Sequence, residues 1–183
     1  MIIIGYKGIG KSSATDNLDN CIDLESSNFW VNGKRSDDWY IIYAHIAEHL
    51  SAQGNIVFTS SHQLLRDYLA KNTTEKVVEI YPSLKIEEDW INRLKYRYIT
   101  NPNTKNKRAL DGAQGYYQDN IESFMNDTGH FMYIELRTAN YKLEDVIECI
   151  QDIEEVFDKE KVIPNNKNNR FYYTDSGNMF TIT

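Results

Sequence analysis

The chain has 183 residues, of which 41% are hydrophobic, so its length and composition predict one domain with a substantial core. Its 27 acidic and 20 basic residues give a net charge of −7, which argues against binding a nucleic-acid polymer through long-range attraction. The apolar start extends for only three isoleucines before Gly5. This is far short of a membrane span or a signal segment, so we expect a cytoplasmic protein with no membrane partner.

The most specific pattern in the chain lies between its first predicted strand and its first predicted helix. Residues 2–4 are consecutive isoleucines, typical of a buried parallel strand, and a short helix is predicted from Ser12 to about Leu18. Between them, Gly5 to Ser12 reads GYKGIGKS, a full match to the phosphate-loop pattern G-x-x-x-x-G-K-[ST]. Glycines let consecutive N–H groups point at a phosphate, and the following helix directs its positive end toward the same anion.

This loop predicts a binding site for nucleotide phosphates and Mg²⁺. Lys11 would reach the outer phosphates, and the Ser12 hydroxyl would bind the metal ion. The alternative interpretation is a glycine-rich turn before a helix, and the strand and helix on either side argue against it. The residues expected around the phosphates are Gly5, Lys7, Gly8, Ile9, Gly10, Lys11, Ser12 and Ser13.

The rest of the chain alternates between strand and helix patterns. Further strands are predicted at residues 20–23, 55–60, 76–81 and 131–136. Further helices are predicted at about residues 36–53, 62–71, 86–98, 114–126 and 143–157. This alternation predicts an α/β fold of three layers, with a five-stranded parallel sheet flanked by helices.

Two stretches follow neither pattern. Residues 100–113 combine a proline, several asparagines and a basic cluster, which predicts a polar, mobile connection. The tail is rich in asparagine and then in aromatic residues, and its turn residues 176–178 are compatible with a terminal hairpin. We therefore expect one domain over residues 1–163, with a lid within about residues 84–115, and a tail over residues 164–183 that is compatible with a hairpin packed on this domain.

Charged side chains are predicted to gather near the phosphate loop, because ligands of an open parallel sheet bind beyond the carboxyl ends of its strands. Asp23 and Glu25 directly follow the second strand. Arg66 lies near the start of the helix after the third strand, where it would reach back into the same crevice. Arg93 and Arg97 are four residues apart, so they lie on one side of their helix.

Taken together, these segments resemble nucleoside monophosphate kinases, and most of all the small deoxynucleotide kinases or adenylate kinase-like proteins of bacteriophages and prophages. The resemblance covers roughly residues 1–150, and only the phosphate loop is a highly specific motif within it. The other similar segments are DLESS from Asp23, VFTSSH from Val57 with Arg66, IYPS from Ile80, WINRLKYR from Trp90, and residues 133–145. The resemblance implies a P-loop NTPase fold with a small helical lid.

The resemblance also implies an activity, which is transfer of a phosphoryl group from ATP to a small acceptor. The favoured acceptor is a (deoxy)nucleoside monophosphate. Lys11 and a Mg²⁺ ion on Ser12 and Asp23 would hold the donor, and Arg93 and Arg97 would close over the transferring group. A solvated helix face is the alternative interpretation of the two arginines.

The acceptor-binding residues that the resemblance implies are Asp23, Glu25, His62 and Arg66, with Arg66 binding the acceptor's phosphate. Three of them have a structural alternative. Asp23 would only cap a loop, Arg66 would pair with a neighbouring carboxylate, and His62 would be a residue of the helix start or the core.

One position departs from the pattern of ATPases that hydrolyse ATP or drive motion. The third strand ends in Phe58-Thr59-Ser60-Ser61, without the acidic Walker B residue that those enzymes place near the metal ion. This argues against a motor and leaves Asp23 as the carboxylate expected nearest Mg²⁺. Two other functions stay open, a regulatory module that binds a nucleotide without turnover and a P-loop kinase of a non-nucleotide acceptor. The protein would act as a monomer or a homodimer.

Overall fold

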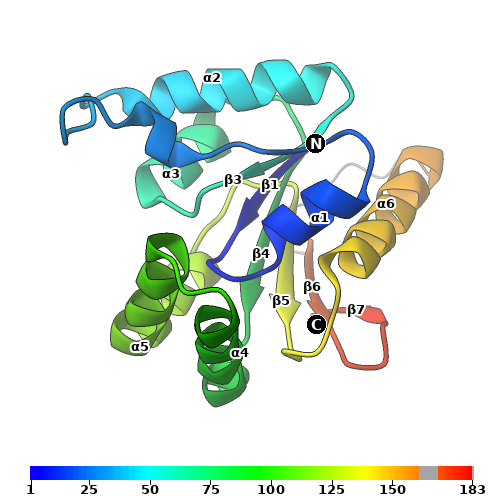
Figure 1. The fold of residues 1–183 in the computed structure, drawn as a ribbon. Coiled ribbons are helices and arrows are strands. Elements are labelled where there is room, and N and C mark those ends of the chain that lie inside the picture. Colours follow the sequence, from blue (N-terminus) through cyan, green and yellow to red (C-terminus); the bar gives the residue numbers. More distant parts are fainter. Residues whose placement is uncertain (161–168, 183) are drawn as a thin grey trace.

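The computed structural model describes residues 1–160 and 169–182, which form an α/β fold with a sheet between two layers of helices (Figure 1). The sheet has seven strands in the order β2-β3-β1-β4-β5-β6-β7. The pairings among β1 to β6 are parallel, and β7 pairs antiparallel with β6. The strands are β1 (Ile2–Gly5), β2 (Cys21–Asp23), β3 (Ile56–Thr59), β4 (Val77–Pro82), β5 (Met132–Leu136), β6 (Arg170–Tyr173) and β7 (Met179–Thr181).

The helices pack on the sheet through apolar faces. Helices α1 and α6 lie against each other on one face, whereas α2, α3 and α5 cover the other face, with α4 against α5 (Figure 1). In the described residues, no helix combines the length and the apolar character needed to cross a bilayer. The helices are α1 (Lys11–Asn17), α2 (Trp39–Ala52), α3 (Gln63–Asn72), α4 (Glu87–Thr100), α5 (Thr104–Met125) and α6 (Leu143–Glu160), with short 3₁₀ turns η1 (Ser26–Phe29) and η2 (Leu84–Ile86).

Strand β1 lies at the centre of the core, and the glycine-rich loop of residues 5–12 follows directly from it. Its three isoleucines are 0% exposed, and the strand pairs with β3 on one side and β4 on the other. From β1 the chain crosses to β2 on one side of the sheet, and after β3 it crosses to β4 on the other. The crevice at such a change of direction is where open α/β sheets bind ligands.

The prediction of an α/β fold with a mostly parallel sheet is confirmed, but the prediction of five strands is wrong. The two additional strands come from the tail, where β6 pairs with β5 from Tyr133↔Arg170 to Leu136↔Tyr173. The alternation of Phe171 and Tyr173 places two aromatic side chains in the core, which favours pairing at this edge. Residues 164–168 and 183 of the predicted tail lie outside the described residues.

The prediction of a mobile loop over residues 100–113 is also wrong, because α5 begins at Thr104. Asn103 caps this helix, its side-chain oxygen accepting a hydrogen bond of 2.8 Å from the backbone N–H of Asn106. Tyr116, at φ −145°, marks a kink. The buried face follows a helical period that the lysines and asparagines between its members obscure: Asn106, Leu110, Ala113, Tyr117, Ile121 and Phe124.

Replacing the cap of α5 tests how this helix begins. We expect Asn103→Ala to lower the free energy of unfolding by about 1 kcal/mol, because the backbone N–H of Asn106 loses its partner. Urea denaturation measures this change. Lys107→Ala, which removes an exposed side chain of the same helix, is the control and should stay within about 0.5 kcal/mol of the parent. Equal effects of the two substitutions would contradict the capping role.

Candidate functional site

The loop after β1 owes its shape to glycines with positive φ. Gly8 has φ +87° and Gly10 has φ +104°, a region of backbone conformation that other residues rarely adopt. A Cβ atom at Gly8 would lie 2.6 Å from Leu94 Cδ2, so α4 packs directly against the loop at this point. Both the backbone conformation and the close packing therefore require glycine at residue 8.

Lys11 lies at the bottom of the loop and is held by the ends of two strands. Its Nζ atom donates hydrogen bonds to the backbone oxygens of Gly5 at 3.3 Å and Thr59 at 3.0 Å. Burial lowers the pKa of the Lys11 ammonium, and the negative charges of Asp23 and Glu25 oppose this shift. Thr59, which ends β3 where ATPases have the acidic Walker B residue, thus accepts a hydrogen bond from Lys11 through its backbone oxygen.

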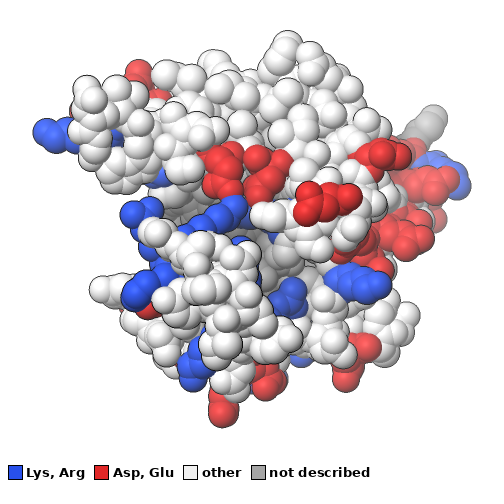
Figure 2. Space-filling view, viewed as in Figure 1, with Lys and Arg blue, Asp and Glu red and all other residues white. Residues whose placement is uncertain are grey.

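A cavity of about 680 Å³ opens over the loop, between the strand ends and helices α4 and α5. Figure 2 shows Lys and Arg side chains gathered in and around a hollow at the centre of the face. Although the whole chain is acidic, the cavity is lined by one carboxylate, that of Asp23, and by six basic side chains: Lys7, Lys11, Arg93, Arg97, Lys105 and Arg108. This concentration of positive charge favours a polyanionic ligand.

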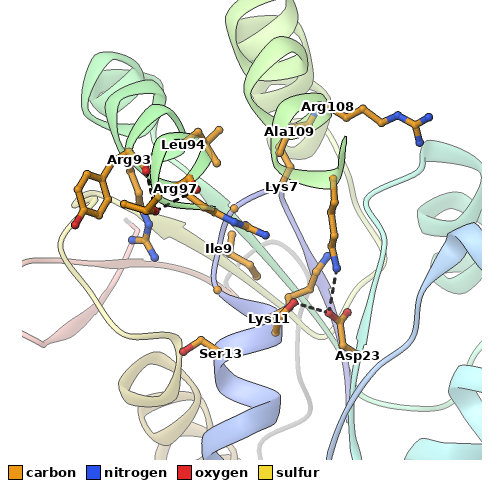
Figure 3. A pocket seen from close by; sticks show the side chains of 16 residues that line it. Lys7, Ile9, Lys11, Ser13, Asp23, Arg93, Leu94, Arg97, Arg108 and Ala109 are labelled. Atoms are coloured by element: carbon orange, nitrogen blue, oxygen red, sulfur yellow. Dashed lines mark hydrogen bonds and ion pairs between the residues drawn. The ribbon is translucent and has the colours of Figure 1, made fainter. Parts of the chain in front are cut away.

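The two arginines of α4 lie differently in the cavity. Arg97 extends over the loop (Figure 3), and within residues 1–160 and 169–182 its guanidinium makes no hydrogen bond or ion pair. Burial and the charge of Arg93 lower the pKa of Arg97. Arg93 Nη1 donates to the backbone oxygen of Ala139 at 2.6 Å, and its guanidinium lies 4.6 Å from the ring centre of Tyr141. Arg97 is therefore the arginine better placed to contact a ligand.

Oxygen ligands for a metal ion lie beside the loop. The Ser12 hydroxyl donates a hydrogen bond of 3.1 Å to Asp23 Oδ2, so a hydroxyl and a carboxylate, which are oxygen ligands of the kind that suit Mg²⁺, converge beside the loop. Lys105 of α5 contacts the same region, with Nζ 3.9 Å from Asp23 Oδ2. It also forms an ion pair with Glu25, which is half-exposed at the rim.

Arg66 is not part of this cavity. Its side chain is 4% exposed, and its guanidinium donates to Asp127, to the backbone oxygen of Ser61 and to Ser123. The guanidinium also lies 4.2 Å from the ring centre of Phe124. Arg66 therefore forms an ion pair with a carboxylate, as the structural alternative proposed. The partner is Asp127, however, and not one of the acidic residues of α2 or α3 that lie nearer in the sequence.

His62 also lies outside the cavity lining, at the position that precedes α3. Its Nε2 atom lies 3.0 Å from Arg35 Nη1, its Nδ1 atom lies 2.9 Å from Ser60 Oγ, and its ring stands edge-on to Trp39. Because Arg35 can only donate, Nε2 accepts and the imidazole is neutral. Burial and then the positive charge of Arg35 lower the pKa of His62 to about 4.

This arrangement predicts how acid affects stability. The unfolded chain binds a proton at His62 below about pH 6.5, whereas the folded protein binds it only near pH 4. We therefore expect stability to fall as the pH is lowered through this interval. The loss of melting temperature between about pH 7.5 and pH 5 should be smaller in His62→Asn than in the parent or in the control His45→Asn, whose ring is exposed. An equal loss in all three proteins would contradict this assignment.

Lys105 and Arg108 are the basic lining residues that belong to the polar connection predicted over residues 100–113. Their spacing of three residues would have assigned them to one helix face, had α5 been predicted to begin at Thr104. Of the predicted phosphate-binding residues, those from Lys7 to Ser13 all line the cavity, whereas Gly5 does not.

A scan of the sequence against models of protein families finds no match. A search of curated proteins likewise finds no match for the chain.

Proposed function

We propose that this protein is a P-loop kinase that transfers a phosphoryl group from ATP to a small acceptor, with a (deoxy)nucleoside monophosphate as the favoured acceptor. The observation that carries the proposal is the position of Arg97, which extends from α4 across a basic cavity toward the glycine loop and Lys11 (Figure 3). Phosphoryl transfer depends mainly on positioning and charge neutralisation, and this arrangement supplies cations on both sides of a bound phosphate.

The donor would bind along the loop. Lys11 would exchange its contacts with two backbone oxygens for contacts with phosphate oxygens, which are the stronger acceptors for an ammonium. Ser12 and Asp23 provide the oxygen donors that suit Mg²⁺, which would neutralise part of the phosphate charge when bound. Arg97 would then contact the transferring group, and its planar guanidinium matches phosphate oxygens.

The acceptor would bind on the side of the cavity that contains α5 and the end of β2. Asp23 lines the cavity there and Glu25 lies at its rim, whereas Arg66 and His62 do not line the cavity. Lys105 is the cation nearest this region, and an anionic acceptor would compete with Glu25 for it. Lys105 would therefore bind the acceptor's phosphate, which is the role that the family resemblance implied for Arg66.

The test is a coupled assay of ADP release, with Mg²⁺-ATP and a panel of nucleoside and deoxynucleoside monophosphates. We expect turnover that depends on one class of monophosphate and disappears in Lys11→Ala. Lys34→Ala is a matched control, because this lysine lies in the connection between β2 and α2 and does not line the cavity. Binding of ATP without turnover on any acceptor would favour a regulatory module, for which β3 ending in Thr59 is the supporting feature. Turnover only with non-nucleotide compounds would favour a different P-loop kinase.

A further inference from the structure

A second cluster of ionisable groups lies away from the phosphate loop. Glu79 belongs to β4, and Asp127 and His130 belong to the connection between α5 and β5. Each of the three residues offers one possible ligand atom, and these atoms lie within 4.8 Å of one another. Glu79 is 0% exposed and His130 is 2% exposed, so the cluster is inside the protein.

The polar atoms of this cluster are not satisfied by hydrogen bonds. In the part of the chain that the structure describes, neither carboxylate oxygen of Glu79 and neither ring nitrogen of His130 has a hydrogen-bond partner. His130 Nε2 lies 2.7 Å from Glu79 Oε1, but the pair lacks the alignment that an N–H donor needs. Buried polar groups almost always have partners, so two such residues in one cluster indicate a missing ligand.

We propose that Glu79, Asp127 and His130 bind a divalent transition-metal ion of the zinc type through two carboxylates and an imidazole. An imidazole nitrogen suits Zn²⁺ and similar ions, whereas Mg²⁺ and Ca²⁺ prefer sites made of oxygen atoms alone. Zinc–ligand distances of about 2.1 Å in a tetrahedron separate two ligand atoms by about 3.4 Å. Ion binding would therefore move His130 and Glu79 apart by several tenths of an ångström.

A polar cavity adjoins the cluster on the side of Asp127 and His130. Asp127 and His130 line a cavity of about 300 Å³ that reaches the exposed side chains of Asp67 and Lys71. A polar cavity of this size holds several waters, one of which would supply the fourth ligand. The metal ion would join β4 to the connection between α5 and β5, two segments that are distant in the sequence.

The charged groups of the cluster sum to a net negative charge, which favours binding of a cation. Arg66 donates to Asp127 and its Nε atom lies 3.8 Å from Glu79 Oε1, so with a neutral His130 one negative charge remains. Burial raises the pKa of Glu79 to about 7, and Asp127 adds to this shift while His130 and Arg66 oppose it. Arg66 would orient the Asp127 carboxylate, as second-shell groups do in metal sites.

The test is zinc binding to the chelator-treated full chain, measured by competition with a chromogenic chelator and by the melting temperature with and without Zn²⁺. We expect one ion per chain and a rise of several degrees in melting temperature. Glu79→Gln and His130→Gln should each weaken binding by about 100-fold or more and remove the rise, because each removes a direct ligand.

Two control variants distinguish this site from others. His45→Asn with His49→Asn removes an exposed pair at helical spacing on α2, and Asp23→Asn removes the carboxylate beside the phosphate loop. Both should bind zinc like the parent. Loss of binding in either control, binding unchanged in Glu79→Gln, or no binding to the parent would overturn the proposal. If the Glu79 and His130 variants do not fold, anomalous scattering from crystals of the zinc-treated parent decides, since an ion elsewhere or no ion overturns it.

Discussion

Replacing Arg97 with alanine is expected to lower acceptor-dependent turnover by about 10³-fold or more while the protein still folds and binds ATP. Its guanidinium extends over the loop in an open cavity, so its removal leaves no packing defect in the core. The loss would fall mainly on kcat, because this cation would contact the charge that develops in the transition state. Rates from the ADP-release assay, together with ATP affinity from calorimetry, measure the two effects separately.

Arg93→Ala is the matched comparison, since it lies one helical turn earlier on the same helix. Arg93 donates to the backbone oxygen of Ala139 and lies over the ring of Tyr141. Its loss should therefore affect the position of the connection between β5 and α6, and it should reduce turnover less than the loss of Arg97. Arg97→Lys should recover only part of the rate, because an ammonium lacks the planar fork of the guanidinium. An Arg97→Ala protein with parental kcat would refute the proposed role, as would a larger loss in Arg93→Ala.

Replacing Arg66 with alanine is expected to lower the free energy of unfolding by about 3–5 kcal/mol. The substitution removes the guanidinium that pairs with Asp127 and lies 3.8 Å from Glu79, and it leaves both carboxylates buried without a cation. It also removes the contact with the ring of Phe124 and the hydrogen bond to Ser61. Urea denaturation of the metal-free protein measures the loss.

Arg137→Ala is the control for this effect. Arg137 also pairs with a carboxylate, that of Glu135, and covers the ring of Tyr172, but its side chain is 37% exposed. The loss there should be about 1 kcal/mol or less, because water screens the pair and replaces it. If Arg66→Ala kept parental stability and instead raised the acceptor KM, Arg66 would be an acceptor-binding residue after all.

The order of elements from β1 to β5 followed from local patterns. Three consecutive isoleucines favour a buried strand. The positive φ angles of Gly8 and Gly10 favour glycine at these two residues whatever their distant neighbours are. These signals operate over a few residues and need no distant partner. The same holds for α6, whose apolar side chains recur at helical spacing and are buried at Leu143 and Val146.

Long-range contacts determined the rest. The edge position of β6 depends on its pairing with β5, and Arg66 meets Asp127 across 61 residues of chain. Arg66 is therefore buried because Ser123 and Phe124 of α5 pack against it. The sequence around Arg66 carries no signal for this contact. The cluster of Glu79, Asp127 and His130 has the same origin, because Glu79 and His130 meet only when β4 and β5 pair.

By itself the sequence determined a glycine loop at the end of a buried strand, since sterics and hydrophobic burial act locally. Only the tertiary structure decided which cations face that loop. Arg97 and Lys105 belong to helices that pack through Leu94 against Gly8 and through Tyr117 against Ser83, and Arg66 pairs with Asp127 in the connection after α5. Side-chain direction depends on the whole set of packed neighbours, and therefore it appears only once the chain is folded.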